Sequence, residues 1–369
     1  MELDPDGESN DFQRTRRVCL RNGKAAVPGS GLHFHPKVSA IYNIDQKYVK
    51  LSAECFAKKT CLGTLQLGQW RVFDESKRED DAKKFHVELI HVENLRGIGA
   101  CRNMRYLSLR GISRIDAIPD AIGKLSELIV LDLRACYNLQ ALTKEITKLR
   151  KLQYLDVSEC YLLVEMPKGL GKISQLQVLK GFVVASSGRT NACRLSELVG
   201  LENLRKLSIC IGKKVMNGRQ DELKKLASLG NKLKSLIITW GVMTSKEGDT
   251  QTSNAEGMKF SLPPTLKKLD LRCFPCKEFG HLISSFSTQR LSDLENLEKL
   301  YVTGGALESL QPLWVGEDLK VKMLRLRFLE NLQEDGWRKL STKYAQLIIT
   351  RQTMGSPEQF VTNKDESGN

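Results

Sequence analysis

The chain has 369 residues, and 41% of them are hydrophobic, which is enough apolar material for a sizeable core. Its net charge of +14 is compatible with a partner that is an acidic protein, nucleic acid or an anionic membrane surface, and equally with a soluble intracellular protein that is basic without such a partner. We expect no secretory signal in the acidic first residues and no membrane span, because the chain lacks an apolar run of about 18 residues.

The first predicted element is an acidic segment without periodicity. Residues 1–13 contain five acids and a single phenylalanine, so we predict a disordered acidic tail. The first weak repeat begins at Thr15, and the residues before it do not resemble the polar cap that a repeat array needs. Because an uncovered strand edge invites association, we expect a preceding domain or a partner to contact this end.

A long mixed period follows and is plainest in the middle of the chain. Leucines at Leu128, Leu131 and Leu133 have the spacing i, i+3 and i+5, and the same spacing starts again at Met104 and Leu152, 24 residues away on either side. This is the L-x-x-L-x-L core of a leucine-rich repeat, and a helical period of 3.6 does not produce it. Good matches to the core start at Leu62, Met104, Leu128, Leu152, Leu204, Leu233, Leu266, Leu297 and Val321. Weaker matches start at Thr15, Val38, Val87, Leu176 and Tyr344.

The period predicts an α/β repeat fold, a leucine-rich-repeat solenoid shaped as a curved horseshoe. The apolar anchors of each core lie on a short strand and point inward, because side chains alternate across a strand. One repeat cannot bury its apolar face alone, so stacked repeats form one parallel β-sheet on the concave face. Short helical or irregular segments, such as those that begin at Pro119 and Pro167, return the chain along the convex face.

The repeat array is predicted to cover residues 14–354 as one leucine-rich-repeat domain of about 14 repeats. Residues 241–257 are rich in Thr, Ser, Gly and charge, and we predict a loop insertion there. Residues 355–369 are polar, and we predict a second disordered tail.

Sites for chemistry are weakly supported, and we predict no enzyme, no cofactor and no metal. Cys136 and Cys160 occupy the N/C position of the repeat, where a buried small residue is expected. Cys273 and Cys276 form a C-x-x-C without the setting of a redox motif or the four ligands of a zinc site. The histidines lack further ligands in sequence, and no catalytic signature is present. The recurring aspartates Asp132 and Asp156 are predicted to be exposed strand positions.

Binding is expected on the concave strand face, at the positions between the anchors. The early repeats place a mixed set of side chains there, and the later repeats a strongly basic one. This face either docks an acidic protein surface or is a solvated charged face, and a nucleic-acid partner is disfavoured because aromatic stacking residues are few. The predicted protein-binding residues are Arg105, Tyr106, Arg110, Arg134, Tyr154, Lys267, Lys268, Arg272, Lys299, Tyr301, Lys322, Arg325 and Arg327.

Several strings resemble the repeat domain of plant NLR disease-resistance proteins, of the coiled-coil class with RPP13-like members. They are LDLRAC and LDVSEC within 125–179, the LQVLKGFVV run at 176–184, and the strand that ends in Trp240. The resemblance extends over about 14–350. It implies a role in plant defence and innate immunity, in which the repeats sense a pathogen effector or a guarded host protein and hold a nucleotide-binding domain at rest.

The sequence departs from that family in one respect. The family's coiled-coil and nucleotide-binding domains have no counterpart here, since no Gly-Lys pair has the G-x-x-x-x-G-K-[ST] pattern of a phosphate-binding loop. We therefore expect a truncated relative or a fragment of a larger protein. The partner is expected to be an effector, a guarded host protein or such a nucleotide-binding domain, in the cytoplasm or also the nucleus. The alternative is a constitutive leucine-rich-repeat scaffold or adaptor without an immune role.

Overall fold

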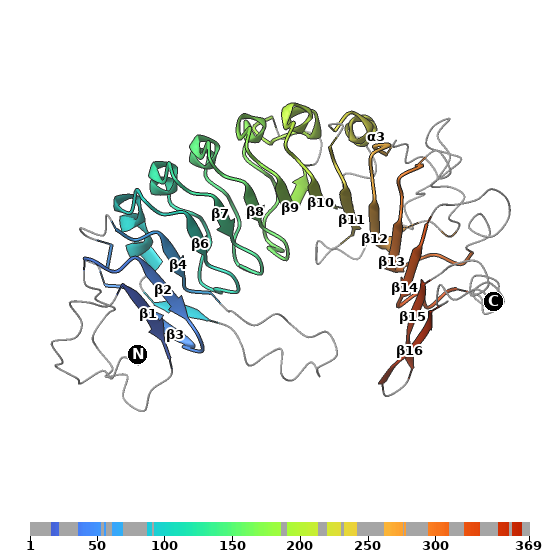
Figure 1. Ribbon diagram of the computed structural model, residues 1–369, viewed down its shortest axis with the longest axis horizontal. Coiled ribbons are helices and arrows are strands. Elements are labelled where there is room, and N and C mark those ends of the chain that lie inside the picture. Colours follow the sequence, from blue (N-terminus) through green and yellow to red (C-terminus); the bar gives the residue numbers. More distant parts are fainter. Residues whose placement is uncertain are drawn as a thin grey trace. The chain divides into compact units, whose positions relative to one another are not determined.

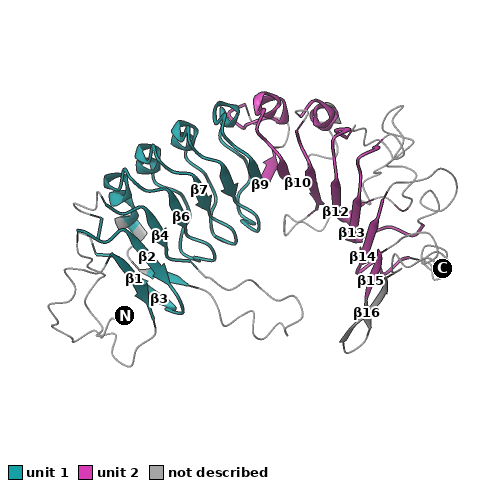
Figure 2. Cartoon of the chain, in the orientation of Figure 1, with its two compact units in different colours: residues 1–181 teal, residues 182–369 magenta. Residues whose placement is uncertain are grey.

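The chain folds into two compact units, residues 1–181 and 182–369, which are coloured separately in Figure 2. The computed structural model describes residues 16–21, 36–52, 55–56, 61–68, 87–90, 92–185, 190–212, 220–229, 232–241, 262–275, 277, 294–309, 321–332, 346–353 and 356–363. The predicted tail at 1–13, and all but Gly241 of the predicted insertion at 241–257, lie outside these residues.

The first unit is built on a parallel sheet whose strands follow one another in chain order (Figure 1). Each strand pairs with the next in parallel, as stacked repeats require. The strands are β1 (Arg17–Leu20), β2 (Ala40–Asn43), β4 (Thr64–Gln66), β6 (Tyr106–Ser108), β7 (Val130–Asp132), β8 (Tyr154–Asp156) and β9 (Val178–Val184), whose first residues lie in this unit.

The 24-residue period sets the register of this sheet. Leu107, Leu131, Leu155 and Leu179 lie directly opposite one another on β6 to β9, and each is at most 1% exposed. Burial of a leucine stabilises the fold by about 1.5–3 kcal/mol. The row of leucines is therefore a continuous core, which explains why the anchors recur at one fixed offset.

Short 3-10 helices return the chain on the other side of the strands (Figure 1). They are η2 (Val92–Ala100), η3 (Asp120–Lys124), η4 (Lys144–Lys148) and η5 (Leu170–Lys172). Each of the last three buries one aliphatic side chain beneath the sheet, such as Ile146 of η4. The side chain of Thr143 caps η4 by accepting a hydrogen bond of 3.2 Å from the backbone N–H of Glu145. A parallel sheet on one side and short helical segments on the other agree with the predicted architecture.

The weak repeat predicted at Val87 is wrong. The strand that follows Val87, β5 (Glu88–Ile90), pairs with β3 (Tyr48–Lys50) in a separate two-stranded sheet. Strand β4 pairs directly with β6 in the main sheet. Only 17 residues separate Val87 from Met104, and a leucine-rich repeat needs about 20–29 to return to the sheet.

Cys136 and Cys160 are buried in the first unit, as predicted. The Sγ of Cys136 donates a hydrogen bond of 3.1 Å to the carbonyl of Leu109, and the Sγ of Cys160 donates one of 3.2 Å to the carbonyl of Leu133. Burial raises the pKa of the Cys136 thiol to about 12, and it also raises the pKa of Cys160. Each thiol therefore stays protonated and joins one repeat to the one before it.

A left-handed turn ends the strand segment at the same offset in many repeats. Six residues with positive φ stand seven positions after the first anchor of their repeat, and they include both glycines and residues with side chains. This conformation favours glycine, so the non-glycine members are strained locally and are held by the repeat around them. The series is Gly111, Ala135, Glu159, Cys273, Gly304 and Phe328.

The second unit repeats the parallel arrangement with longer strands. Helical segments η6 (Leu195–Gly200), α3 (Gln220–Lys224) and η7 (Lys225–Ser228) accompany its early repeats. The strands pair in chain order. They are β10 (Lys206–Ile211), β11 (Ser235–Trp240), β12 (Lys268–Phe274), β13 (Lys299–Gly305), β14 (Met323–Arg327) and β15 (Gln346–Thr353).

Aromatic packing closes the core at the ends of these strands. Trp240 at the end of β11 and Phe274 at the end of β12 are each 1% exposed. Their rings meet edge to face, with centroids 5.5 Å apart and an interplanar angle of 73°. Such an arrangement adds to the burial energy because the ring edge of one residue meets the π face of the other.

The last strand differs from the predicted disordered tail at 355–369. Strand β16 (Ser356–Asn363) runs antiparallel to β15 and pairs with it over the whole of both strands. A hairpin of this kind satisfies the backbone groups that would otherwise be open on the edge of β15. Residues 356–363 therefore correct the expectation of disorder, and the described structure ends at residue 363.

Candidate protein-binding face

Every predicted binding residue lies among the described residues, and the structure divides them between the two units. Arg105, Tyr106, Arg110, Arg134 and Tyr154 belong to the first unit, and the others belong to the second. In both units the side chains between the anchors alternate with the buried leucines, so they lie on the sheet face opposite the core. We call this the polar face of each unit.

A row of polar residues crosses the polar face of the first unit. Ser108, Asp132, Asp156 and Lys180 lie directly opposite one another on β6 to β9. Two of these four, Ser108 and Lys180, were missed by the sequence reasoning. Lys180 follows Asp156 by 24 residues, so the period itself contained the signal that would have found it.

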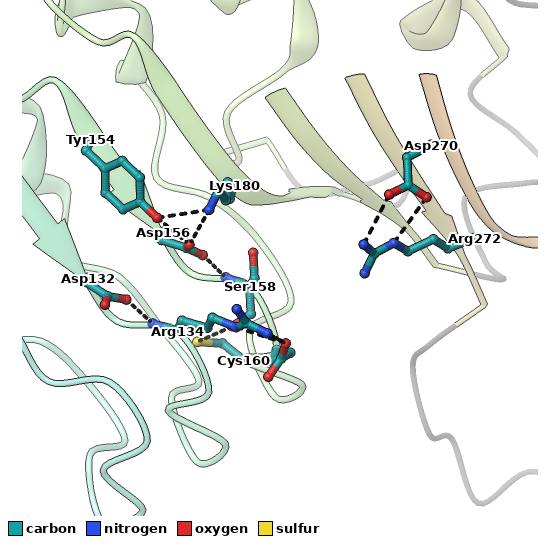
Figure 3. A network of polar contacts seen from close by, with 10 residues as sticks. Asp132, Arg134, Tyr154, Asp156, Ser158, Cys160, Lys180, Asp270 and Arg272 are labelled. Carbon is teal, nitrogen blue, oxygen red and sulfur yellow. Dashed lines mark hydrogen bonds and ion pairs between the residues drawn. The ribbon is translucent and has the colours of Figure 1, made fainter. Parts of the chain in front are cut away.

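Asp156 is the centre of a closed polar cluster, which Figure 3 shows with its partners. Lys180 Nζ donates to Asp156 Oδ2 at 3.1 Å and to the hydroxyl oxygen of Tyr154 at 2.9 Å. The Tyr154 hydroxyl in turn donates to Asp156 Oδ2 at 2.8 Å, and the backbone N–H of Ser158 donates to Asp156 Oδ1 at 3.0 Å. We call Tyr154, Asp156 and Lys180 the Asp156 cluster.

The prediction that Asp156 is exposed is wrong, because its side chain is only 3% exposed. Burial opposes ionisation of this carboxyl, but Lys180 and the hydrogen bonds from Ser158 and Tyr154 outweigh it and lower the pKa below its usual value. Burial opposes the charge of Lys180, but Asp156 and Tyr154 outweigh burial and raise the pKa of Lys180. The pair is therefore ionised and holds the Tyr154 ring in place on the polar face.

The neighbouring carboxyl of Asp132 has a different environment although its residue type and offset are the same. It accepts hydrogen bonds from the Ser108 hydroxyl at 3.3 Å and from the backbone N–H of Arg134 at 3.1 Å. Burial raises the pKa of Asp132. The hydrogen bond from the backbone of Arg134 lowers it, but burial together with the negative charge of Asp156 on the next strand outweighs that hydrogen bond. Asp132 thus lacks a lysine such as the one that Asp156 has.

Arg134 extends the first unit's polar face beyond the strands. Its Nε donates to Glu159 Oε1 at 3.0 Å, and both side chains are 34% exposed. Tyr106 and Arg110 are half-buried on the same face, and Arg105 is exposed. The first unit therefore presents a mixed polar surface with cations, carboxylates and two tyrosines, as predicted.

The polar face of the second unit centres on Tyr301 of β13. Lys268 of β12 places its Nζ 4.3 Å from the centroid of the Tyr301 ring, and Arg325 of β14 places its Cζ 4.6 Å from it. The Tyr301 hydroxyl donates to Met323 Sδ at 3.0 Å. Because β12 and β14 flank β13, the ring holds one cation from each neighbouring strand.

Further charges surround this ring, and one of them is a carboxylate that the sequence reasoning missed. Asp270 is 4% exposed and accepts from Arg272 Nη2 at 3.1 Å and from Arg272 Nε at 3.4 Å (Figure 3). Burial lowers the pKa of Lys268. Asp270 raises it, but the positive charges of Arg272, Arg325 and Lys299 lower it further, so the pKa stays below its usual value. We call this set the Tyr301 cluster: Lys268, Asp270, Arg272, Lys299, Tyr301 and Arg325.

The remaining predicted residues lie at the margins of this cluster. Lys267 pairs with Glu298 at 3.2 Å, and this pair is exposed. Lys322 is exposed, and Arg327 lies opposite Thr303, which lies opposite Arg272. The structure therefore brings the basic residues of the later repeats together on one face of three adjacent strands.

Other candidate chemistry finds no support in the described parts of the chain. No group of three or more His, Cys, Asp and Glu side chains suited to a metal occurs among the residues that were placed. The cysteines within those residues form no disulfide, and Cys273 is exposed, whereas Cys276 and the histidines lie outside the described residues. No helix in the described ranges is both long and apolar enough to cross a membrane.

Solved structures with a similar course of chain include the leucine-rich-repeat ectodomain of the plant membrane receptor kinase GASSHO1/SCHENGEN3 from Arabidopsis thaliana, in complex with CASPARIAN STRIP INTEGRITY FACTOR 2. It is 14% identical, with a TM-score of 0.37, and the match covers 85% of this chain and 38% of that ectodomain. An internalin C2 from Listeria monocytogenes is 18% identical, with a TM-score of 0.28, over 63% of this chain and 83% of the internalin.

No curated protein matches the chain. One family model does, under the description "Leucine-rich repeat region", and it covers residues 81–313. That range includes the strands from β5 to β13, the Asp156 cluster and every member of the Tyr301 cluster except Arg325. The matched repeats, the parallel strands and the rows of buried leucines agree with one another, and the chain belongs to the leucine-rich-repeat family.

Proposed function

We propose that this chain is a protein-recognition module of plant defence, similar to the effector-sensing and autoinhibitory repeat domain of an NLR disease-resistance protein. Its partner is a pathogen effector, a guarded host protein or an NLR nucleotide-binding domain, and it acts in the cytoplasm. Repeat proteins of this kind generally serve as protein-interaction modules without catalytic chemistry. The strings LDLRAC, LDVSEC and LQVLKGFVV support the narrower assignment to defence.

One observation carries the proposal, namely the organisation of the polar face in the second unit. Basic side chains of three neighbouring strands converge around Tyr301, and among the residues that the structure describes a single buried carboxylate, that of Asp270, opposes them. A solvated face without a partner gains nothing from such crowding of like charges, which costs electrostatic energy. An acidic protein surface would offset that repulsion and gain association rate and specificity.

The test compares two charge-reversed variants in affinity capture from the tissue that expresses the chain. The first variant carries Lys267→Glu, Lys268→Glu, Arg325→Glu and Arg327→Glu on the polar face of the second unit. The control carries Lys144→Glu, Lys148→Glu, Lys168→Glu and Lys172→Glu on the helical side of the first unit, where all four lysines are exposed. Both variants have the same net charge.

We expect a defence-related partner to be captured by the natural chain and by the control, and to be lost with the first variant. Equal capture by both variants would show that the basic face is only solvated and would overturn the proposal. A partner with a housekeeping role that fits the same face would instead favour a constitutive scaffold.

A further inference from the structure

The Tyr301 cluster has more positive charge than its own residues can neutralise. Four cationic side chains, those of Lys268, Arg272, Lys299 and Arg325, stand against the single carboxylate of Asp270, which leaves a formal charge of +3. Asp270 is already engaged by Arg272. Among the residues that the structure describes, the other three cations form no ion pair with a carboxylate.

Two of the three cations without a carboxylate partner, Lys268 and Arg325, are held in position by the Tyr301 ring. Tyr301 contacts Lys268 on one side and Arg325 on the other through its ring. The Nε of Arg325 is buried and has no hydrogen-bond partner among the described residues. Lys268 and Lys299 lie directly opposite each other on β12 and β13, where adjacent strands are about 4.8 Å apart.

This arrangement matches a compact anion of more than one charge. A carboxylate has one negative charge, and its planar geometry suits a single guanidinium, as the Asp270–Arg272 pair shows. A phosphate monoester has a charge of about −1.5 to −2 and three acceptor oxygens, so it can contact cations from several directions. The three cations without a carboxylate partner belong to three different strands, β12, β13 and β14.

The open sheet face also indicates how the phosphate is presented. A small free anion on an open face keeps much of its hydration, and exposed charges alone attract it weakly. A phosphate that is carried on a polypeptide gains contacts from its flanking residues along the rows beside the cluster, including those near Thr303 and Arg327. The most favourable occupant is therefore a phosphorylated side chain of a protein.

We propose that the Tyr301 cluster binds a phosphorylated residue of the protein partner, with Lys268, Lys299 and Arg325 as its ligands. Tyr301 is a positioning residue that holds two of these cations. The inference rests on the proposed function and deepens it, because it makes recognition of the partner depend on a modification. Binding of the phosphate relieves the electrostatic repulsion among Lys268, Lys299 and Arg325.

The test is fluorescence anisotropy at low ionic strength with the whole chain and three labelled alanine–glycine peptides. The peptides differ at one position, which is phosphoserine, aspartate or serine. We expect the phosphoserine peptide to bind at least about tenfold more tightly than the aspartate peptide, and the serine peptide to bind most weakly. Inorganic pyrophosphate serves as the free competitor.

Variants assign the binding to the cluster. Lys299→Ala, whose side chain is exposed, and Arg325→Ala are each expected to weaken the phosphoserine peptide about tenfold. Tyr301→Leu is expected to do the same, while Tyr301→Phe keeps the ring and the affinity. Lys151→Ala in the first unit is the matched control and leaves the affinity unchanged. Circular dichroism spectra establish that each variant is folded.

Three results would overturn the inference: equal affinity for the phosphoserine and aspartate peptides, unchanged affinity in Lys299→Ala, or pyrophosphate binding as tightly as the peptide. The last result would identify a free phosphate compound as the ligand. Any of these results leaves the proposed function standing if the charge-reversed variant still loses its partner. Conversely, if the phosphoserine peptide binds as expected but no partner depends on the face, the proposed function fails.

Discussion

The Asp156 cluster allows a quantitative test of what holds the polar face of the first unit. Substituting Lys180→Met keeps most of the aliphatic stem but removes the ammonium that Asp156 and Tyr154 share. A hydrogen bond to a charged group contributes about 1.5–3 kcal/mol, and the loss of one partner of a fully buried pair costs about 3–5 kcal/mol. Asp156 is 3% exposed but Lys180 is 34% exposed, so we expect about 2 kcal/mol.

The assay is urea denaturation followed by circular dichroism, at neutral pH and again near pH 3. The folded-state pKa of Asp156 is lowered, so its contribution is present above the pKa of the unfolded chain, about 3.9, and is lost as the pH falls through the folded value. In Lys180→Met, burial dominates and the carboxyl takes up its proton more readily. The difference in unfolding free energy should therefore be about 2 kcal/mol at pH 7 and should shrink in acid.

Two further variants complete the test. Lys151→Met removes an exposed lysine that pairs with Glu127 at 2.7 Å, and it should cost about 0.5 kcal/mol or less. The double variant Asp156→Asn with Lys180→Met removes both charges and should recover part of the loss. An unchanged stability of Lys180→Met at pH 7, or the same loss at both pH values, would refute the reasoning.

Two other predictions concern the core. Gly181→Ala should destabilise the chain by about 3 kcal/mol, because a Cβ would lie 2.6 Å from backbone atoms of Val157 and Ser158 and φ is +79°. Gly200→Ala is the control, because nothing lies within 4 Å of the added Cβ. Thermal unfolding of this control should show little change in stability. Similar losses of stability in both variants would contradict the close-approach argument. Trp240→Ala should lower the unfolding free energy measured in urea by about 3–5 kcal/mol, because removal of a fully buried ring that packs against Phe274 leaves a cavity. A loss below about 1 kcal/mol would contradict this expectation and would mean that the surrounding side chains fill the cavity.

The candidate site was only partly predictable. The period placed Tyr301 and Arg325 at the same offset of neighbouring repeats and Lys268 two residues earlier in its own repeat, and the structure brings the three together. The period places Lys180 and Asp270 on the strand face, but it does not show how they pair, because the burial and the partners of a strand position depend on the side chains of the adjacent repeats. Residue type and offset alone do not contain that information.

By itself, the sequence determined the repeat architecture of this protein. Its period fixes which residues become anchors, and the need to bury them fixes the parallel stacking and the register, as the row from Leu107 to Leu179 shows. Only the tertiary structure decided where the period fails. Strand β5 pairs outside the main sheet, and β16 turns back along β15.

The tertiary structure also separated Asp132 from Asp156, which the sequence presents as equivalent. Both are aspartates at the same offset on adjacent strands, but the strand beside Asp156 supplies Lys180, whereas the carboxyl of Asp132 meets Ser108 and the negative charge of Asp156. The pKa of one is lowered and that of the other is raised. Electrostatic energies depend on distance and burial in space, and these are set only when neighbouring repeats pack together.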